Sequence, residues 1–305
     1  MFILIFNQLL KMLFIMLLSV FLFRIGIVSQ DGNKTISRLL LMVINPCVIL
    51  TVYQTDFDER LVRGLLLAFA AGIAAHFIAI LAARILIPAK NNPDYALERF
   101  ASVYSNCGFL GIPLINSVLG SEGVFYLTAY MTVFNILAFT HGMTLLSGKF
   151  ELKKLKEGLL SPVAIATVIA VLLFFTQFRI PGVLKDSMQY IADMNTPAAM
   201  MVAGFSLAQS NIGRIFKKWR IYRVTAVKLL AVPLLVLVFL KLFRIEPTVA
   251  YVTLIAAACP TSTMTTMLSI QLDKNYQYSS EIFSFTTVLS ILTIPLVALA
   301  ASFVL

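Results

Sequence analysis

The chain alternates between long apolar runs and short polar connections. Ten apolar runs can be traced, at about 2–24, 36–54, 61–87, 100–119, 123–147, 159–177, 187–210, 222–243, 248–271 and 280–304. Each run is close to the roughly 20 residues that a helix needs to cross about 30 Å of hydrocarbon. The pattern therefore predicts an all-α integral membrane protein with ten transmembrane helices.

Two of these runs are interrupted by polar residues, glycine and proline. The fourth run contains Ser105-Asn106-Cys107-Gly108-Phe109-Leu110-Gly111-Ile112-Pro113, and the ninth contains Ala258-Cys259-Pro260-Thr261-Ser262-Thr263. A free backbone N–H or C=O is costly in lipid, so such a break persists only where protein buries it or where it lines a wet cavity. Both breaks are therefore candidates for the place where a solute binds.

The interruptions belong to an internal repeat. Asn45-Pro46 in the second run has a counterpart 151 residues later in Asn195-Thr196-Pro197, and Pro113 and Pro260 are 147 residues apart. This predicts two five-helix halves, 1–148 and 159–305, joined by a short cytoplasmic linker at 149–158. Because five is odd, the second half enters the membrane from the opposite side, as in the inverted repeats of transporters. The alternative is coincidence, because membrane helices tolerate proline.

The breaks offer the chemistry of an anion site. Proline removes an N–H and disfavours helical geometry in the residue before it, so we expect unwinding near Ile112 and Cys259. The half-helices that follow carry partial positive charge at their N-termini, which suits an anion without any full positive charge. The predicted substrate-binding residues are Asn106, Gly108, Gly111, Ile112, Pro113, Cys259, Pro260, Thr261, Ser262 and Asn45. The alternative is that glycine and asparagine only hold helices together.

Composition and charge place the chain in a membrane. The chain is 60% hydrophobic and 12% charged, and its mean hydropathy of +0.92 is far from that of a soluble domain. The net charge of +10 does not indicate a nucleic acid partner, because the basic residues fall in short loops. Loops after odd-numbered helices hold sixteen Lys and Arg, against six after even-numbered ones. The positive-inside rule then predicts a multi-pass protein of the cell (inner) membrane with both termini extracytoplasmic.

Few side chains suggest chemistry beyond binding. Asp193 and His141 are ionisable groups within apolar runs, where such groups are costly and often functional, so both are candidates for coupling transport to an ion. The alternative for His141 is a neutral hydrogen-bonding role. The cysteines Cys47, Cys107 and Cys259 lack metal-site spacing, and no hydrolase motif occurs. We therefore expect no metal, no cofactor and no enzymatic activity.

The motif Asn106-x-Gly108-x-x-Gly111-x-Pro113, the break at Pro260, and Pro46 and Pro197 together resemble the auxin efflux carrier family. That family includes plant PIN auxin transporters and bacterial malate and malonate permeases, and the resemblance covers essentially the whole chain. It implies an elevator-type carrier in which helices 1, 2, 6 and 7 form a scaffold and the other helices move. The substrate would lie where helices 4 and 9 cross, and Asn106 matches the substrate-contacting asparagine of the family.

These observations predict a secondary transporter, a permease for a small organic anion such as a carboxylate, working by alternating access in the lipid bilayer. A sodium-coupled symporter of the bile-acid type is one alternative, although no Asp or Glu lies between Glu246 and Asp273. A membrane sensor without transport is the other alternative. Whether two copies pair as a homodimer is left open by the sequence.

Overall fold

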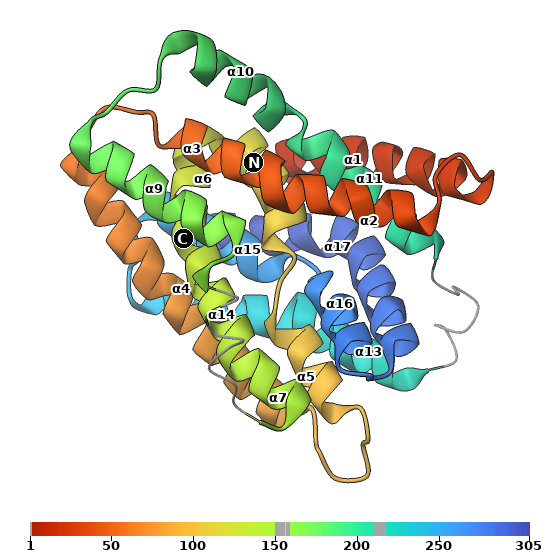
Figure 1. The fold of residues 1–305 in the computed structure, drawn as a ribbon. Coiled ribbons are helices and arrows are strands. Elements are labelled where there is room, and N and C mark those ends of the chain that lie inside the picture. The colour runs from red at the N-terminus through yellow and green to blue at the C-terminus, as the bar shows by residue number, and fades with distance from the viewer. Residues whose placement is uncertain (1, 150–155, 157–158, 210–217) are drawn as a thin grey trace.

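The computed structural model describes all residues except 1, 150–155, 157–158 and 210–217 (Figure 1). Most of the linker expected at 149–158 lies outside the described residues. The regular secondary structure of the described residues is helical, and their one β interaction is an isolated antiparallel bridge between Ser105 and Thr261. The predicted all-α class is therefore confirmed.

The first half of the chain is divided into helices and short π-helical segments, the latter labelled η. In chain order these are α1 (Phe2–Arg24), α2 (Gln30–Leu39), η1 (Leu40–Ile44), α3 (Asn45–Val52), α4 (Glu59–Leu86), α5 (Tyr95–Val103), η2 (Cys107–Gly111), α6 (Ile112–Leu137), η3 (Ala138–Gly142) and α7 (Met143–Ser147). Helix α6 breaks at Gly120, where φ is 65°. Glycine adopts such a φ at little cost.

The second half is likewise divided into α-helices and a short π-helical segment. Its elements are α9 (Pro162–Thr176), α10 (Gly182–Asp193), α11 (Asn195–Ala208), α13 (Trp219–Ala226), η4 (Val227–Ala231), α14 (Val232–Leu242), α15 (Pro247–Ala258), α16 (Met264–Gln271) and α17 (Tyr276–Val304).

Several of these elements are long and apolar enough to cross a membrane. Within the described residues there are six such stretches, Ile3–Arg24, Gln30–Val52, Glu59–Leu86, Cys107–Ser147, Trp219–Leu242 and Tyr276–Val304. The stretch Cys107–Ser147 has 41 residues and includes the break at Gly120. Helices α9 and α15 are apolar but shorter. The protein thus has several membrane spans, and the number of ten stays a prediction because breaks divide some spans into short pieces.

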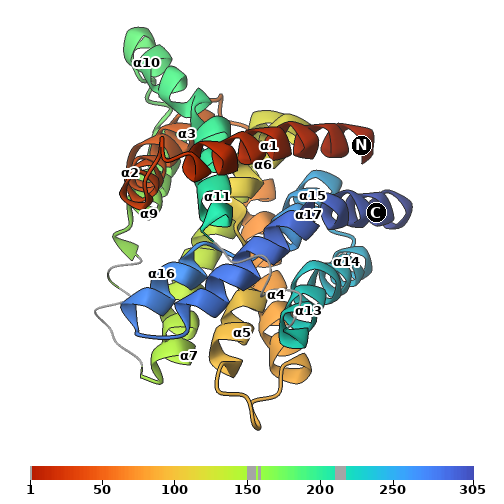
Figure 2. The same cartoon turned by 90° about the vertical axis from the view of Figure 1, so that its right-hand side faces the viewer.

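The helices gather into two groups (Figure 2). In the first group, α1 packs along α11, α2 packs on α11, and α3 packs against α9 and α10. In the second group, α4 packs on α6, α15 packs on α4 and α6, and α14 and α16 pack against α15 and α17, respectively. The first group corresponds to the predicted helices 1, 2, 6 and 7. Its packing is tight, because a Cβ at Gly204 in α11 would lie 2.4 Å from the carbonyl oxygen of Met16 in α1.

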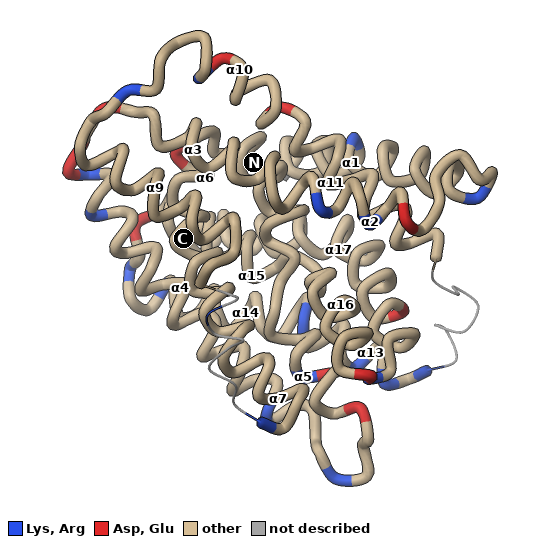
Figure 3. Tube along the Cα trace, in the orientation of Figure 1, with Lys and Arg blue, Asp and Glu red and all other residues tan. Residues whose placement is uncertain are grey.

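Charged residues lie mostly at helix ends and in connections (Figure 3). One cluster joins α5, α13 and α17 of the second group. The buried Glu98 accepts hydrogen bonds from Arg220 Nε at 2.7 Å, Arg223 Nη2 at 2.8 Å and the Tyr278 hydroxyl at 2.8 Å. A buried carboxylate with several charge-assisted partners fixes the elements that supply them.

Candidate functional site

The two interruptions predicted from the sequence pair with each other through the main chain. The Asn106 N–H donates to the Pro260 carbonyl at 2.7 Å, and the Ser262 N–H donates to the Tyr104 carbonyl at 2.9 Å. Together these bonds form the antiparallel bridge between Ser105 and Thr261. Each interruption satisfies backbone groups of the other, which removes the cost of breaking a helix in an apolar interior.

The first interruption begins earlier than predicted. Helix α5 ends at Val103, and residues 104–106 are non-helical, whereas Pro113 is the second residue of α6. The expected unwinding near Ile112 is therefore wrong, and Asn106 lies in the break itself with φ −79° and ψ 50°. The reason is η2, in which the Ile112 N–H donates to the Cys107 carbonyl. A π-helical turn skips a carbonyl of the usual ladder, so it accommodates a residue without an N–H.

The second interruption lies where the sequence placed it. Helix α15 ends before Cys259, Pro260 follows, and α16 begins at Met264. The Ser262 hydroxyl accepts a hydrogen bond from the Met264 N–H at 3.2 Å, so it serves one of the free donors at the start of α16. The Thr261 hydroxyl points elsewhere and donates to the Ala101 carbonyl at 2.9 Å.

A lysine outside the predicted set of binding and coupling residues lies at the paired interruptions. Lys228, in η4, is fully buried, and its ammonium donates to Ser105 Oγ at 2.5 Å and to the Ala257 carbonyl at 3.1 Å. Among the described residues, no carboxylate forms an ion pair with it. A basic side chain thus lies beside the paired interruptions, where the sequence predicted no full positive charge.

Asn106 itself is buried, with 3% of its surface exposed. Among the described residues, its side-chain Nδ2 has no hydrogen-bond partner. A buried donor without a partner is costly and is rare in folded proteins. Asn106 is not among the residues that line the two cavities described below.

A second pair of asparagines lies beside this segment. Asn195 Nδ2, at the start of α11, donates to Asn45 Oδ1, at the start of α3, at 2.7 Å. Both side chains are buried. A Cβ at Gly108 would lie 3.9 Å from Asn45 Nδ2, so the pair lies next to η2. The two prolines that the repeat aligned are thus close to two asparagines that contact each other.

Gly111 lies beside both interrupted segments. A Cβ at this position would lie 3.3 Å from Cys107 Cβ and 3.6 Å from Cys259 Sγ. Both cysteines are buried free thiols. Gly111 in η2 therefore packs next to Cys259 at the end of α15.

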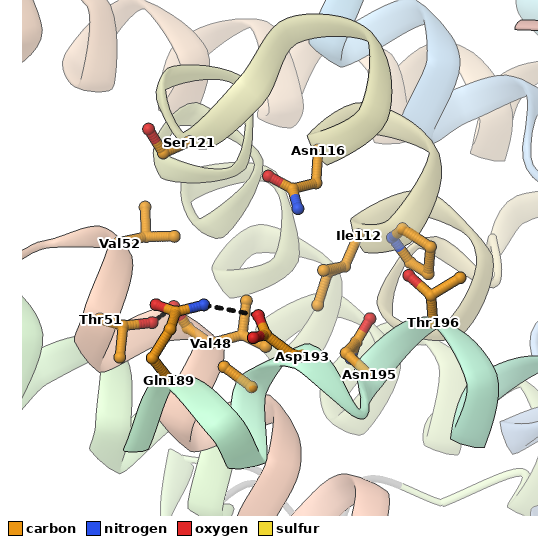
Figure 4. Close-up of a pocket in the computed structure, with 12 residues that line it drawn as sticks. Val48, Thr51, Val52, Ile112, Asn116, Ser121, Gln189, Asp193, Asn195 and Thr196 are labelled. Atoms are coloured by element: carbon orange, nitrogen blue, oxygen red, sulfur yellow. Dashed lines mark hydrogen bonds between the residues drawn. The ribbon is translucent and has the colours of Figure 1, made fainter. Parts of the chain in front are cut away.

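A cavity of about 230 Å³ lies between α3, α10 and α11 of the first group and α6 of the second group (Figure 4). In the following text this is the first cavity. Asn116 faces it from α6, and Asp193, Asn195 and Thr196 face it from the opposite wall. The predicted residues Ile112 and Pro113 also line it.

A second cavity of about 360 Å³ lies between α2 and α11 of the first group and η2, α16 and α17 of the second group. Its lining includes Lys34 and Arg38 from α2, Phe109 from η2, and Thr263 at the start of α16. Helices α2 and α3 are successive parts of one long helical stretch, so the two cavities lie toward its opposite ends. The segment from Asn106 to Pro113 thus contributes to both cavities.

The two coupling candidates differ in their surroundings. Asp193 is exposed at the end of α10 and accepts a hydrogen bond from Gln189 Nε2 at 2.7 Å. His141 is half-buried in η3, and its Nδ1 lies 3.0 Å from the Tyr104 hydroxyl. Tyr104 is the first residue of the interruption, so His141 contacts the paired segments whereas Asp193 contacts the first cavity. Among the described residues, no group of three or more His, Cys, Asp or Glu could hold a metal ion.

Several membrane-spanning helices and two cavities that share one interrupted segment are the features of a multi-pass membrane transporter. The chain belongs to the membrane transport protein family that includes the auxin efflux carriers, and the family model matches residues 4–298. The family resemblance of the motif at Asn106 is thereby confirmed.

Two archaeal proteins show the same relationship along nearly their whole length. A transporter of Methanothermobacter thermautotrophicus described as uncharacterised is 24% identical over 293 residues, covering 94% of this chain and 95% of that protein. Another from Methanocaldococcus jannaschii, described in the same way, is 22% identical over 282 residues, covering 89% and 90% of the two chains. The similarity therefore covers both halves of the chain.

Proposed function

We propose that the protein is a secondary transporter that moves a small organic anion, such as a carboxylate, by an elevator-type alternating-access mechanism. The anion binds at the paired interruptions, where its carboxylate accepts a hydrogen bond from Asn106 Nδ2. The ammonium of Lys228, which hydrogen-bonds the neighbouring Ser105, adds positive charge near the solute.

One observation supports this most strongly: the segment from Asn106 to Pro113 borders two separate cavities. Ile112 and Pro113 line the first cavity, and Phe109 lines the second. Each cavity has one wall from the first group of helices and one from the second. A relative movement of the two groups would widen one cavity and close the other, which is the requirement of alternating access.

The architecture that we propose with this function has two inverted repeats of five helices, 1–148 and 159–305. The first group acts as the scaffold, and the second group moves with the solute. Both termini lie outside the cytoplasm, in the cell membrane. The Asn45–Asn195 contact supports the repeat, because these residues are 150 positions apart and meet face to face.

The sodium-coupled alternative is disfavoured by the charge at the crossing. A sodium site needs several oxygen ligands and gains from carboxylates, whereas the ammonium of Lys228 already occupies Ser105 Oγ and the Ala257 carbonyl. A second cation beside it would be repelled in this low-dielectric interior. A sensor without transport would not need two cavities bordering one segment.

Flux into vesicles tests the proposal. The purified full-length protein is reconstituted into liposomes, and uptake of radiolabelled mono- and dicarboxylates is measured against empty vesicles. We expect saturable uptake of at least one carboxylate that unlabelled solute inhibits. Absence of flux for the whole panel, with correctly inserted protein, would contradict the proposal.

The variant Asn106→Ala locates the site. Losing one hydrogen bond to a charged group costs about 1.5–3 kcal/mol, so binding should weaken by roughly tenfold to a hundredfold. Asn116→Ala is the matched control, because Asn116 lines the first cavity one turn beyond Pro113. Equal binding by Asn106→Ala and the parent would place the carboxylate elsewhere.

A further inference from the structure

The second cavity carries positive charge on the wall that α2 supplies. Lys34 and Arg38 line it, and no acidic side chain is part of its described lining. Lys34 pairs with Asp31 at 2.9 Å, but both side chains are mostly exposed, and such a pair contributes little. Among the described residues, Arg38 forms no ion pair. The charge of Arg38 is therefore open to an anion in the cavity.

Arg38 also lies inside a stretch that is long and apolar enough to cross the membrane. That stretch begins at Gln30 and ends at Val52, so Arg38 is about 12 Å along the helix from its start. A charged side chain within such a stretch is costly unless it extends to the membrane interface and meets a counter-charge. Lipid phosphates lie at that interface, and basic pockets between membrane helices bind lipid headgroups.

The wall that α16 supplies is apolar and continues onto the outer surface of the protein. Met267 and Ile270 line the cavity, and their side chains are 57% and 61% exposed. Leu41 and Phe283 add further apolar surface to the lining. Such surface gains free energy when it is covered by an apolar group. One cavity therefore combines a cationic wall with an apolar wall, as an amphiphilic anion requires.

A buried asparagine in the same lining has an unused hydrogen-bonding group. Asn33 is 8% exposed, and its Nδ2 donates to Ser206 Oγ at 3.3 Å. Its Oδ1 has no partner among the described residues. Exchanging the two amide atoms lets the serine hydroxyl donate to the oxygen and leaves the nitrogen free. In either assignment the amide can bind a polar group in the cavity.

From these features we propose that the second cavity binds an anionic phospholipid whose headgroup carries hydroxyls, such as phosphatidylglycerol. The lipid phosphate accepts hydrogen bonds from Arg38, a headgroup hydroxyl or phosphate oxygen pairs with Asn33, and an acyl chain covers Met267 and Ile270. The lipid contacts both groups of helices, because the cavity lies between them. This site is separate from the proposed solute site at the paired interruptions and does not depend on which solute is transported.

Other occupants fit the cavity less well. A zwitterionic lipid would bring an ammonium beside Arg38, where like charges repel. A soluble phosphate would use the basic residues and leave the apolar wall uncovered. Both differ from the proposed lipid in one feature only, so each serves as a comparison in the test.

Quenching of tryptophan fluorescence by brominated lipids tests the inference. Trp219 is the single tryptophan of the chain, so Trp219→Phe combined with Met267→Trp places one fluorophore in the cavity lining. This full-length background protein is reconstituted into phosphatidylcholine vesicles that contain equal fractions of brominated phosphatidylglycerol or brominated phosphatidylcholine. We expect about tenfold stronger binding of phosphatidylglycerol, because each basic residue near a lipid surface contributes about fivefold.

Arg38→Leu in this background should lower the preference for phosphatidylglycerol about fivefold. Arg24→Leu is the matched control, because it removes the same charge from an exposed position at the end of α1, outside the cavity lining. It should change the preference less than about twofold. Equal losses in the two variants would show attraction by surface charge alone and would overturn the site. A background protein without any preference would also overturn it, even where Arg38→Leu fails to fold.

Glycerol phosphate distinguishes a lipid from a soluble phosphate. Added in excess to the same vesicles, it should leave quenching by brominated phosphatidylglycerol unchanged. Loss of that quenching would assign the cavity to soluble anions and overturn the lipid site. Because these measurements involve no transport, a lack of solute flux would count against the proposed function alone.

Discussion

Lys228 Nζ lies 2.5 Å from Ser105 Oγ, so a buried ammonium contacts the first helix interruption. The next residue along the chain is Asn106, the proposed anion contact. Neutral oxygens hold the ammonium, so its charge is not cancelled within the described part of the protein. An uncompensated cation in an apolar interior is costly for folding and is useful for binding an anion.

Replacement of this lysine should separate binding from stability. Two unit charges about 4 Å apart at an effective dielectric constant of about 20 attract by about 4 kcal/mol, so Lys228→Met should weaken anion binding by more than about tenfold. Ser105 Oγ is already 3.4 Å from the Ala257 carbonyl and can donate to it when the ammonium is gone. The melting temperature should therefore equal or exceed that of the parent. Lys241→Met, at an exposed position, is the control; parental affinity in Lys228→Met would refute the electrostatic role.

The pH dependence of flux should distinguish the two coupling candidates. His141 contacts Tyr104 in the interruption, and histidine is the side chain that ordinarily changes charge between about pH 5 and 8. We expect His141→Gln to flatten the pH profile of transport and to leave solute binding at neutral pH largely intact. Asp193→Asn should keep the profile, because Asp193 is exposed and hydrogen-bonded to Gln189. Unaltered profiles in both variants would leave the two residues with structural roles only.

The close packing between α1 and α11 predicts that one added methyl group at Gly204 lowers the stability of the protein. In Gly204→Ala the new Cβ would lie 2.4 Å from a backbone oxygen of α1, so the helices must separate. Overpacking of this kind typically costs about 1–3 kcal/mol, and a lower melting temperature in detergent should report it. Gly182→Ala is the control, because a Cβ there meets no atom within 4 Å. Equal melting temperatures for the two variants would contradict the close helix contact.

Membrane sidedness can be tested by cysteine labelling in a background without the native cysteines. Single cysteines at Lys90 and Lys274 should be shielded from an impermeant thiol reagent in intact cells, and one at Asp186 should react. All three positions are exposed, so accessibility depends on the side of the membrane. The reverse labelling pattern would invert the proposed orientation.

The interruptions could be predicted from the sequence because proline, glycine and polar residues within apolar runs have few structural explanations, whereas the inverted repeat stays a prediction. The break predicted at Pro260 is present, since α15 ends at Ala258 and α16 begins at Met264. The break predicted at Pro113 lies instead at residues 104–106, because the π-helical η2 accommodates the proline. Such a turn has no local signature that distinguishes it from an ordinary helix.

The buried lysine could not be placed from the sequence for a different reason. Lys228 is separated from Ser105 by 123 residues, and only the packing of η4 against the paired interruptions brings them together. The sequence did indicate that Asn45 and Asn195 are related, since the predicted repeat aligned Pro46 with Pro197. It did not indicate that the two asparagines contact each other. Their unpaired amide atoms are visible only in three dimensions, because they depend on what other side chains leave unsatisfied.

The hydrogen bonds that join the two interruptions are between main-chain groups, so substitutions of side chains leave these bonds in place. Asn106 and Ser262 contribute their N–H groups, and Pro260 and Tyr104 contribute carbonyls, so the pairing does not require particular side chains at most of these positions. Random substitution across residues 105–109 and 261–263 should therefore yield many folded variants. Mutation can then alter the side chains around these segments step by step while the main-chain pairing persists.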